Sequence, residues 1–325
     1  MISIIMSVFS EPIIWLEESI NSILNQSYKD FEFVIVCDNP ENKDAQIVIK
    51  KYSEKDERIV PILNDSNLGL TKSLNKGLDI SKGEFIARMD ADDIAHPDRL
   101  SKQVCFLVEH PQISICSTDA RIIDDNSNII AKTKVHGQII IENLYRHSPI
   151  IHPTVMFRRS LLKLRNPFYN EQYKVSQDYE LWTFLYLSNI KFAIIAESLL
   201  DYRISSKQIS KQRYDLQIKN SSQIASNFYV KMLAKLIPGV GGLSFSEQID
   251  VLSKSIARVP GDEQKMYLEL LYRQYYTALR KDKKYILKYI ADSNKLIIKL
   301  PFRKTIYMLL SLFAKNRYNQ FLLYF

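Results

Sequence analysis

The first 110 residues alternate between two hydrophobic patterns. Short, continuous apolar runs are typical of strands buried inside a parallel sheet. Four such runs occupy residues 2–8, 31–37, 58–63 and 85–89. The segments near 12–24, 70–80 and 97–108 repeat apolar residues every three or four positions, which predicts amphipathic helices there. A polar helix is expected around 41–54. This alternation predicts an α/β fold with a doubly wound, mostly parallel sheet.

The alternation of strand and helix weakens beyond residue 113. Shorter apolar runs predict strands at 113–117, 129–132, 154–158, 191–195 and 199–203. Helical periodicity predicts helices near 138–146 and 178–188, and then a helical pattern from about residue 208 to the end. We therefore expect two domains, an α/β domain at 1–207 and a helical C-terminal region at 208–325.

Size and composition are those of an ordinary globular protein. The 325 residues, 46% of them hydrophobic and 25% charged, suffice for one large or two medium domains. The three cysteines lack metal-ligand spacing, so neither a disulfide framework nor a zinc site is expected. The apolar N-terminus lacks a basic region and a cleavage site, and no apolar run reaches the ~20 residues of a membrane span. A cytoplasmic location is expected.

Positive charge is concentrated near the C-terminus. The chain carries a net charge of +8, and residues 281–325 hold ten Lys and Arg against two Asp. The apolar run Thr305–Ala314 lies between Lys304 and Lys315, with several aromatic residues close by. This pattern suggests peripheral attachment to an anionic membrane surface on the cytoplasmic face. An ordinary helical domain or a dimer interface explains it equally well, and no nucleic-acid-binding module is recognised.

Three carboxylates follow the buried run at 85–89 directly. On an extended chain Asp90 and Asp92 point the same way, whereas Asp93 turns elsewhere. Pro97 is predicted to be the first helical residue, with Asp98 in the first turn. Ligands bind at the carboxyl ends of strands in open α/β sheets, and carboxylates there hold Mg²⁺ or Mn²⁺ against a substrate's phosphates. In the alternative interpretation, these acids cap the next helix or are simply solvated.

Two common nucleotide-binding signatures are absent from the sequence. A dinucleotide dehydrogenase needs Gly-x-Gly-x-x-Gly after the first strand, and a P-loop enzyme needs Gly-x-x-x-x-Gly-Lys-Ser/Thr. The first glycine of this chain is Gly69, which also excludes the glycine-rich loop of a sugar nucleotidyltransferase. Among the nucleotide-binding sites considered, one kind remains: a site that binds a nucleoside diphosphate through a metal ion held by carboxylates.

Seven segments of the chain form an ordered set of motifs: Ser3–Ser10, Ser22–Asp38, Asn67–Leu70, Met89–Asp93, His152–Arg158, Gln177–Trp182 and Tyr202–Arg203. In this order they resemble family 2 glycosyltransferases, and most closely the bacterial enzymes that assemble capsule, exopolysaccharide and O-antigen. The resemblance covers about residues 1–205. It implies a GT-A fold, a nucleotide-sugar donor (most often a UDP-sugar), Mn²⁺ or Mg²⁺ as cofactor, and inversion at the anomeric carbon. The implied acceptor is a growing surface glycan or a lipid-linked sugar.

The resemblance also assigns roles to individual residues. The donor-binding residues it implies are Ser7, Phe9, Asp38, Asn67, Asp90 and Arg203. The family usually has Asp-Asp-Gly-Ser where this chain has Cys37–Pro40, a departure close to the nucleoside base. The planar fork of Arg203 suits a diphosphate, although a surface ion pair explains an arginine there equally well.

The metal ligands and the catalytic base are assigned in the same way. The resemblance places Asp92, Asp93 and His152 at the metal–diphosphate, whereas a lone histidine is by default a structural group. Asp178 is the expected general base, because an inverting transfer needs a carboxylate to deprotonate the acceptor hydroxyl. In the alternative interpretation Asp178 caps the helix that follows it. The competing class is a catalytically silent nucleotide-sugar-binding scaffold, against which the retained acids at 38, 90, 92 and 178 argue.

Overall fold

The computed structural model describes residues 1–133, 147–205 and 213–236, with ten isolated positions besides. Residues up to Ile224, apart from the segment 141–147, form one compact unit, and the described residues from Ala225 onward belong to a second. The predicted domain boundary at residue 207 lies outside the described residues. The basic tail at 281–325 and nearly all of the predicted helix at 138–146 lie outside them too.

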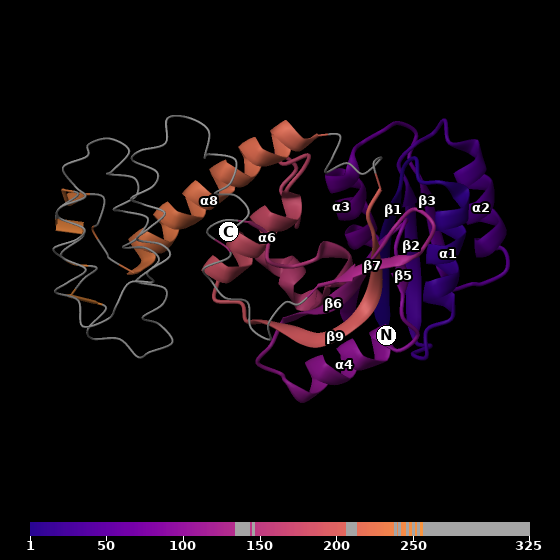
Figure 1. Cartoon of the computed structure of the whole chain (residues 1–325), viewed down its shortest axis with the longest axis horizontal. Helices are drawn as coiled ribbons and strands as arrows, with labels where there is room; N and C mark the ends of the chain where they lie inside the picture. The colour runs from indigo at the N-terminus through magenta and orange to yellow at the C-terminus, as the bar shows by residue number, and fades with distance from the viewer. Residues whose placement is uncertain are drawn as a thin grey trace. The chain divides into compact units, whose positions relative to one another are not determined.

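Four parallel strands form one half of the sheet, as the apolar runs predicted (Figure 1). In chain order they are β1 (Ile2–Val8), β2 (Phe31–Cys37), β3 (Ile59–Leu63) and β4 (Phe85–Asp90). Their order in the sheet is β3-β2-β1-β4, and all three pairings are parallel. The carboxyl ends of β1, β2 and β4 therefore lie at one edge of the sheet, where Asp38 and Asp90 follow or end a strand.

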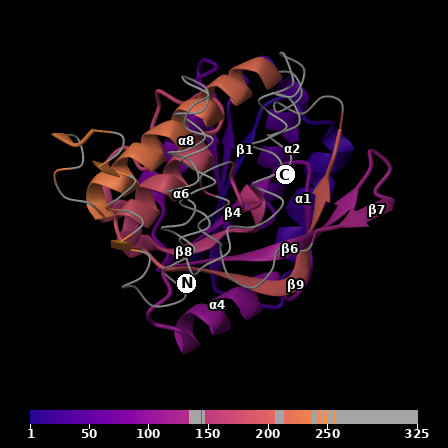
Figure 2. The same cartoon turned by 60° about the vertical axis from the view of Figure 1, so that its left-hand side comes forward.

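The other half of the sheet mixes strand directions. Its strands are β5 (Ile94–Ala95), β6 (Ile115–Ile123), β7 (Ile129–Lys132), β8 (Met156–Arg158) and β9 (Phe192–Arg203). β8 is antiparallel to both β4 and β6, β9 is parallel to β6, and β5 and β7 are antiparallel to β9 and β6. Figure 2 shows β6, β7 and β9 running side by side. The sheet is thus mixed, with a parallel half that carries the first four strands.

Two predictions for this half need correction. The strands predicted at 191–195 and 199–203 are one strand, β9, whose register against β6 shifts between Ile195 and Ser198. That bulge interrupts the apolar pattern without ending the strand. The strand predicted at 154–158 begins only at Met156, because a short 3-10 helix, η1 (His152–Thr154), contains Pro153 at its start.

Helices cover both faces of the sheet. They are α1 (Ile13–Leu24), α2 (Lys43–Ser53), α3 (Leu70–Ile80), α4 (Arg99–Glu109), α6 (Gln177–Leu187) and α8 (Tyr214–Leu236), with a second 3-10 helix, η2 (Arg159–Leu164). Apolar residues of α1, α2 and α4 share one core with alternate residues of β1, such as Ile4 and Met6. α3 packs on the opposite face, so closely that a Cβ added to Gly77 would lie 2.8 Å from Ile5 Cγ2. This is the doubly wound arrangement that was predicted.

The start of α4 differs from the prediction. The helix begins at Arg99, and Asp98 occupies the cap position without a side-chain capping bond. Pro97 precedes the helix, and its carbonyl accepts a hydrogen bond from Ser27 N at 2.8 Å. The Arg99 side chain turns inward, where its buried guanidinium donates to the Arg88 carbonyl at 2.7 Å. Along the described part of the chain, no helix is both long and apolar enough to cross a membrane.

Candidate active site

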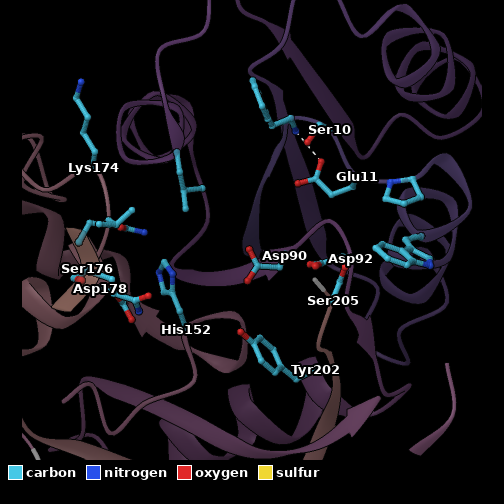
Figure 3. A pocket seen from close by; sticks show the side chains of 17 residues that line it. Ser10, Glu11, Asp90, Asp92, His152, Lys174, Ser176, Asp178, Tyr202 and Ser205 are labelled. Carbon is cyan, nitrogen blue, oxygen red and sulfur yellow. Dashed lines mark hydrogen bonds between the residues drawn. The ribbon is translucent and has the colours of Figure 1, made fainter. Parts of the chain in front are cut away.

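A pocket of about 240 Å³ opens where the parallel strands end (Figure 3). Five of the ten predicted site residues line it, and they come from four separate segments of the chain. These five are Phe9, Asp90, Asp92, His152 and Asp178. The other five, Ser7, Asp38, Asn67, Asp93 and Arg203, do not line it. Tertiary structure therefore brings together residues up to 169 positions apart.

Asp90 and Asp92 form one side of the pocket. Asp90 ends β4 and pairs with the buried guanidinium of Arg88, and its carbonyl accepts from Ser19 Oγ at 2.8 Å. Asp92 lies two residues further on, and its side chain also faces the pocket. Asp93, by contrast, is fully buried away from the pocket. This confirms the expected divergence of the three carboxylates.

Burial, together with neighbouring negative charge, raises the pKa of Asp92 to about 7. Burial is the largest cause, followed by the neighbouring carboxylates of Asp90 and Glu11. The pKa of Glu11 is itself raised by burial, although its Oε2 accepts from Phe9 N at 2.7 Å. Within the described residues, no three His, Cys, Asp or Glu side chains are grouped closely enough to hold a metal ion by themselves. A cation here would therefore need oxygen ligands from a substrate as well.

Arg203 is buried behind the pocket and hydrogen-bonds the loop after β4 that carries Asp92 and Asp93. Its backbone N–H donates to Asp93 Oδ1 at 2.9 Å, and its Nε donates to the Asp92 carbonyl at 2.7 Å. Its two terminal nitrogens donate to Glu18 Oε2 at 2.8 Å and to the Asp124 carbonyl at 3.0 Å. Each guanidinium nitrogen thus donates to a protein oxygen, and the side chain is fully buried. The arginine that was predicted to clamp a diphosphate contacts the protein instead, and it is no exposed ion pair either.

Asp38 plays a similar supporting part at the end of β2. Its two oxygens accept hydrogen bonds from the backbone N–H groups of Leu68 and Gly69, both at 2.8 Å, and from Asn64 Nδ2. The side chain of Asn67 accepts from Gly69 N at 3.0 Å. The carboxylate therefore fixes the loop between β3 and α3. Ser7 lies within β1, where it is buried.

His152 meets the pocket from η1. Its Nε2 lies 2.8 Å from the Tyr169 hydroxyl, and its ring packs edge-on against Tyr169 and Trp182. Burial, with a smaller contribution from the charge of Arg88, holds the pKa of His152 well below its usual value. The imidazole is therefore neutral at pH 7. Trp182 is fully buried, as expected for a core residue.

Asp178 approaches the pocket from the first turn of α6. Ser176 adopts a left-handed conformation (φ 63°) at the cap position, and the helix begins at Gln177. The cap is therefore not Asp178, which corrects that alternative. Burial raises the pKa of Asp178, while hydrogen bonds from the Tyr179 N–H and the Ser148 hydroxyl oppose the shift. A carboxylate whose pKa is raised toward neutrality suits proton transfer.

Several pocket residues were assigned no role in the sequence analysis. They are Glu11, Lys174, Ser176, Gln177, Tyr202 and Gln217. Glu11 had a usable signal, since it follows β1 by only a few residues at the same edge of the sheet as Asp90. Lys174 and Gln217 had none, because no periodicity or motif marks their segments. Arg88 was also missed, although a cation inside an otherwise apolar strand is unusual.

A family comparison matches this geometry. The family model described as Glycosyl transferase family 2 matches residues 3–165. The chain belongs to this family and is a glycosyltransferase. The sheet, the acid-ended strand β4 and the pocket at the strand ends are the GT-A-type arrangement that the resemblance implied.

Individual relatives agree with that assignment. An uncharacterized glycosyltransferase of Methanocaldococcus jannaschii, MJ1057, is 38% identical over 243 residues, which cover 70% of this chain and 83% of the relative. The O-antigen biosynthesis glycosyltransferase WbnJ of Escherichia coli is 32% identical over 215 residues, covering 65% and 82%. The structure of S. aureus TarS 1–349 in complex with UDP-GlcNAc aligns with a TM-score of 0.57 at 20% identity, covering 87% of this chain and 88% of TarS.

Proposed function

We propose that this glycosyltransferase is an inverting, metal-dependent enzyme that moves a sugar from a UDP-sugar to a hydroxyl of a surface glycan or lipid-linked acceptor. One observation supports the proposal above the others. A single pocket has the acid pair Asp90 and Asp92 on one side and Asp178 on the other. Inversion needs two such groups on opposite faces of the sugar, one for the leaving diphosphate and one for the attacking hydroxyl.

The residues present fit a hard divalent cation. Asp92 is a carboxylate destabilised by two carboxylate neighbours, Asp90 and Glu11, and a bound cation would remove that repulsion. Mg²⁺ or Mn²⁺ commonly binds one or two protein carboxylates together with substrate phosphates. When bound, such an ion neutralises charge on the departing diphosphate. We assign Asp92 as its direct ligand, with the neutral His152 and the buried Asp93 beside it.

Asp178 is proposed as the general base. Its raised pKa brings the carboxylate closer to the operating pH, where proton acceptance from a hydroxyl is most effective. The N-terminus of α6 holds the carboxylate through the Tyr179 N–H. On the donor side, Asp90 is proposed to contact the ribose and Phe9 the base. Ser7, Asp38, Asn67 and Arg203 then act from behind the pocket by fixing the strand ends and loops.

The first experiment is nucleotide release from a panel of UDP-, GDP- and dTDP-sugars with Mn²⁺ or Mg²⁺. We expect slow, metal-dependent hydrolysis of one donor, because water can replace the acceptor. Asp92→Ala should abolish it. Asp178→Asn should lower turnover by about 10²- to 10⁴-fold with little change in donor affinity, the range for loss of a general base.

Two results would contradict the proposal. Equal turnover with and without a chelator would remove the cation from the mechanism. Full activity of Asp178→Asn would remove the proposed base. The exposed Asp79, which lies on α3 and does not line the pocket, supplies the matched control as Asp79→Asn.

A lipid-linked acceptor is proposed on the strength of one relative. An E. coli enzyme 28% identical over 222 residues is described as a UDP-Glc:alpha-D-GlcNAc-diphosphoundecaprenol beta-1,3-glucosyltransferase. It covers 68% of this chain. An enzyme with such an acceptor works at a membrane surface, which agrees with the basic, aromatic tail of this sequence.

Liposome flotation tests the membrane proposal. The full chain should float with vesicles that contain anionic lipid. A 1–280 truncation should not, because it lacks the ten basic residues of 281–325. High salt should weaken the binding of the full chain, since screening reduces surface electrostatics. Equal flotation of both proteins would refute the attachment through the tail.

A further inference from the structure

The two ends of the pocket differ in charge. In Figure 3, Glu11, Asp90 and Asp92 lie toward one side. Lys174 and Asp178 lie on the other side. Of the described residues that line the pocket, Lys174 is the only lysine or arginine. The end that holds the proposed general base therefore also holds a cation.

The side chains of Lys174 and Gln177 have no hydrogen-bond partner among the residues that the structure describes. Within the described part of the chain, the Lys174 ammonium forms no ion pair or hydrogen bond. The Gln177 side chain lines the same pocket and is only 5% exposed. No described residue hydrogen-bonds with that amide. The amide faces the pocket, so its N–H and carbonyl groups are available to a ligand bound there.

The segment that carries these groups is held from both sides. Thr71 Oγ1 donates to the Tyr173 carbonyl at 2.7 Å, and Asn220 Nδ2 donates to the Val175 carbonyl at 3.0 Å. Ser176 Oγ lies 3.3 Å from Ser221 Oγ. Lys174 and Gln177 thus project from a backbone that is anchored immediately before and after the lysine. The fixed backbone keeps both side chains at this end of the pocket.

We propose that the acceptor carries an anionic group, a phosphate or a carboxylate, close to its reactive hydroxyl, and that Lys174 and Gln177 bind this group. The proposal rests on the proposed function, because Asp178 marks the acceptor end only if it is the general base. An ammonium and an amide N–H together match the oxygens of an anion. The donor diphosphate has its own place beside Asp90 and Asp92, where a cation compensates its charge.

The anion can come from two sources, a sugar diphosphate carrier or an acidic sugar. The test therefore uses three series of octyl acceptors for each of several hexoses: neutral glycosides, glycosyl diphosphates, and glycosides of the corresponding uronic acids. Transfer from the donor identified above is measured as kcat/KM at low and high ionic strength. Wild type is compared with Lys174→Met, Lys174→Arg and Gln177→Leu.

We expect wild type to prefer one anionic series over the neutral one by about tenfold or more, the factor that 1.4 kcal/mol represents. Lys174→Met should remove most of this preference through a higher KM for the acceptor, and Lys174→Arg should retain it. The KM of the donor and the rate of donor hydrolysis in water should stay unchanged. Which series is preferred identifies the source of the anion.

Three outcomes would overturn the inference. Wild type could show no preference for an anion, the preference could survive in Lys174→Met, or the loss could fall on the KM of the donor. Lys163→Met, at an exposed lysine that does not line the pocket, controls for a general loss of charge. If wild type fails even to hydrolyse a donor, the proposed function fails first, so the two failures are distinguishable.

Discussion

Individual carboxylates in this enzyme have properties that depend on their neighbours. Asp90, Asp92 and Asp93 lie within four residues, yet the first two line the pocket and the third is sealed behind it. Asp93 keeps one buried oxygen, Oδ2, without a partner among the described residues, and burial raises its pKa well above the usual value. Such strain is common where a protein concentrates like charges for function.

The pKa of Asp92 predicts a pH-dependent stability. Between its ordinary value of 3.8 and about 7, the folded chain holds a proton on Asp92 that the unfolded chain has released. Raising the pH through this window therefore lowers the free energy of unfolding. Asp92→Asn removes this contribution, so the variant should gain stability relative to wild type as the pH rises from 4 to 8. Urea unfolding in the absence of metal measures both proteins.

The matched control for this experiment is Asp79→Asn. Its difference from wild type should stay constant over the same pH range, because Asp79 is exposed and lies outside the pocket. A constant difference for Asp92→Asn as well would show that its carboxyl titrates normally in the folded protein. Added Mn²⁺ should diminish the pH dependence of wild type if Asp92 binds the ion.

At the scale of secondary structure, one residue joins three elements around the acid loop. Arg203 ends β9, and its guanidinium bonds the loop after β4, helix α1 and the turn between β6 and β7. The guanidinium also lies over the Trp15 ring, 4.8 Å from its centroid, and Trp15 lines the pocket. The last residue of β9 thereby fixes the position of Asp92.

Replacing Arg203 should destabilise the protein strongly. Arg203→Met leaves Glu18 and several buried carbonyls without their donor, which should cost about 3 kcal/mol of unfolding free energy. Arg203→Lys retains the charge but not the planar fork, so we expect an intermediate loss. Arg159→Met, at an exposed arginine, should stay within about 0.5 kcal/mol of wild type. An unchanged urea midpoint for Arg203→Met would contradict the supporting role.

At the scale of the whole molecule, the compact catalytic unit extends beyond the resemblance. It continues to Ile224, so the first part of α8 belongs to it. Asn220 and Ser221 of that helix hold Val175 and Ser176, next to the proposed acceptor end of the pocket. The predicted boundary at 207 was drawn where the family motifs stop, and residue 207 itself lies outside the described residues.

This extension predicts different stabilities for two fragments. A fragment of residues 1–224 should unfold at a higher urea concentration than a fragment of residues 1–207, because it retains the contacts of Asn220 and Ser221. The hydrogen bonds alone are worth about 1–2 kcal/mol. In the full chain, Asn220→Ala should cost about 1 kcal/mol. Equal stability of the two fragments would place the boundary at 207 after all.

The sequence by itself determined the local structure and the chemistry at the strand ends. Hydrophobic period fixes which segments become strands or helices, and β1 to β4 followed the prediction within about two residues. The same alternation placed Asp90 and Asp92 on one side, since side chains two apart on an extended chain share a face. Local periodicity could not reveal that β9 continues through a bulge or that Arg99 turns inward, because both depend on distant partners.

Only the tertiary structure decided which residues share the pocket and which support it. The sequence alone does not distinguish whether Arg203 and Asp38 contact a donor or support the loops behind the pocket. Their burial and their hydrogen bonds to distant loops, which only the folded structure shows, favour the supporting role. Lys174 and Glu11 approach the pocket from opposite ends because the folded sheet aligns segments more than 160 residues apart. Charge compensation and burial are properties of that three-dimensional neighbourhood, so no local pattern in the sequence encodes them.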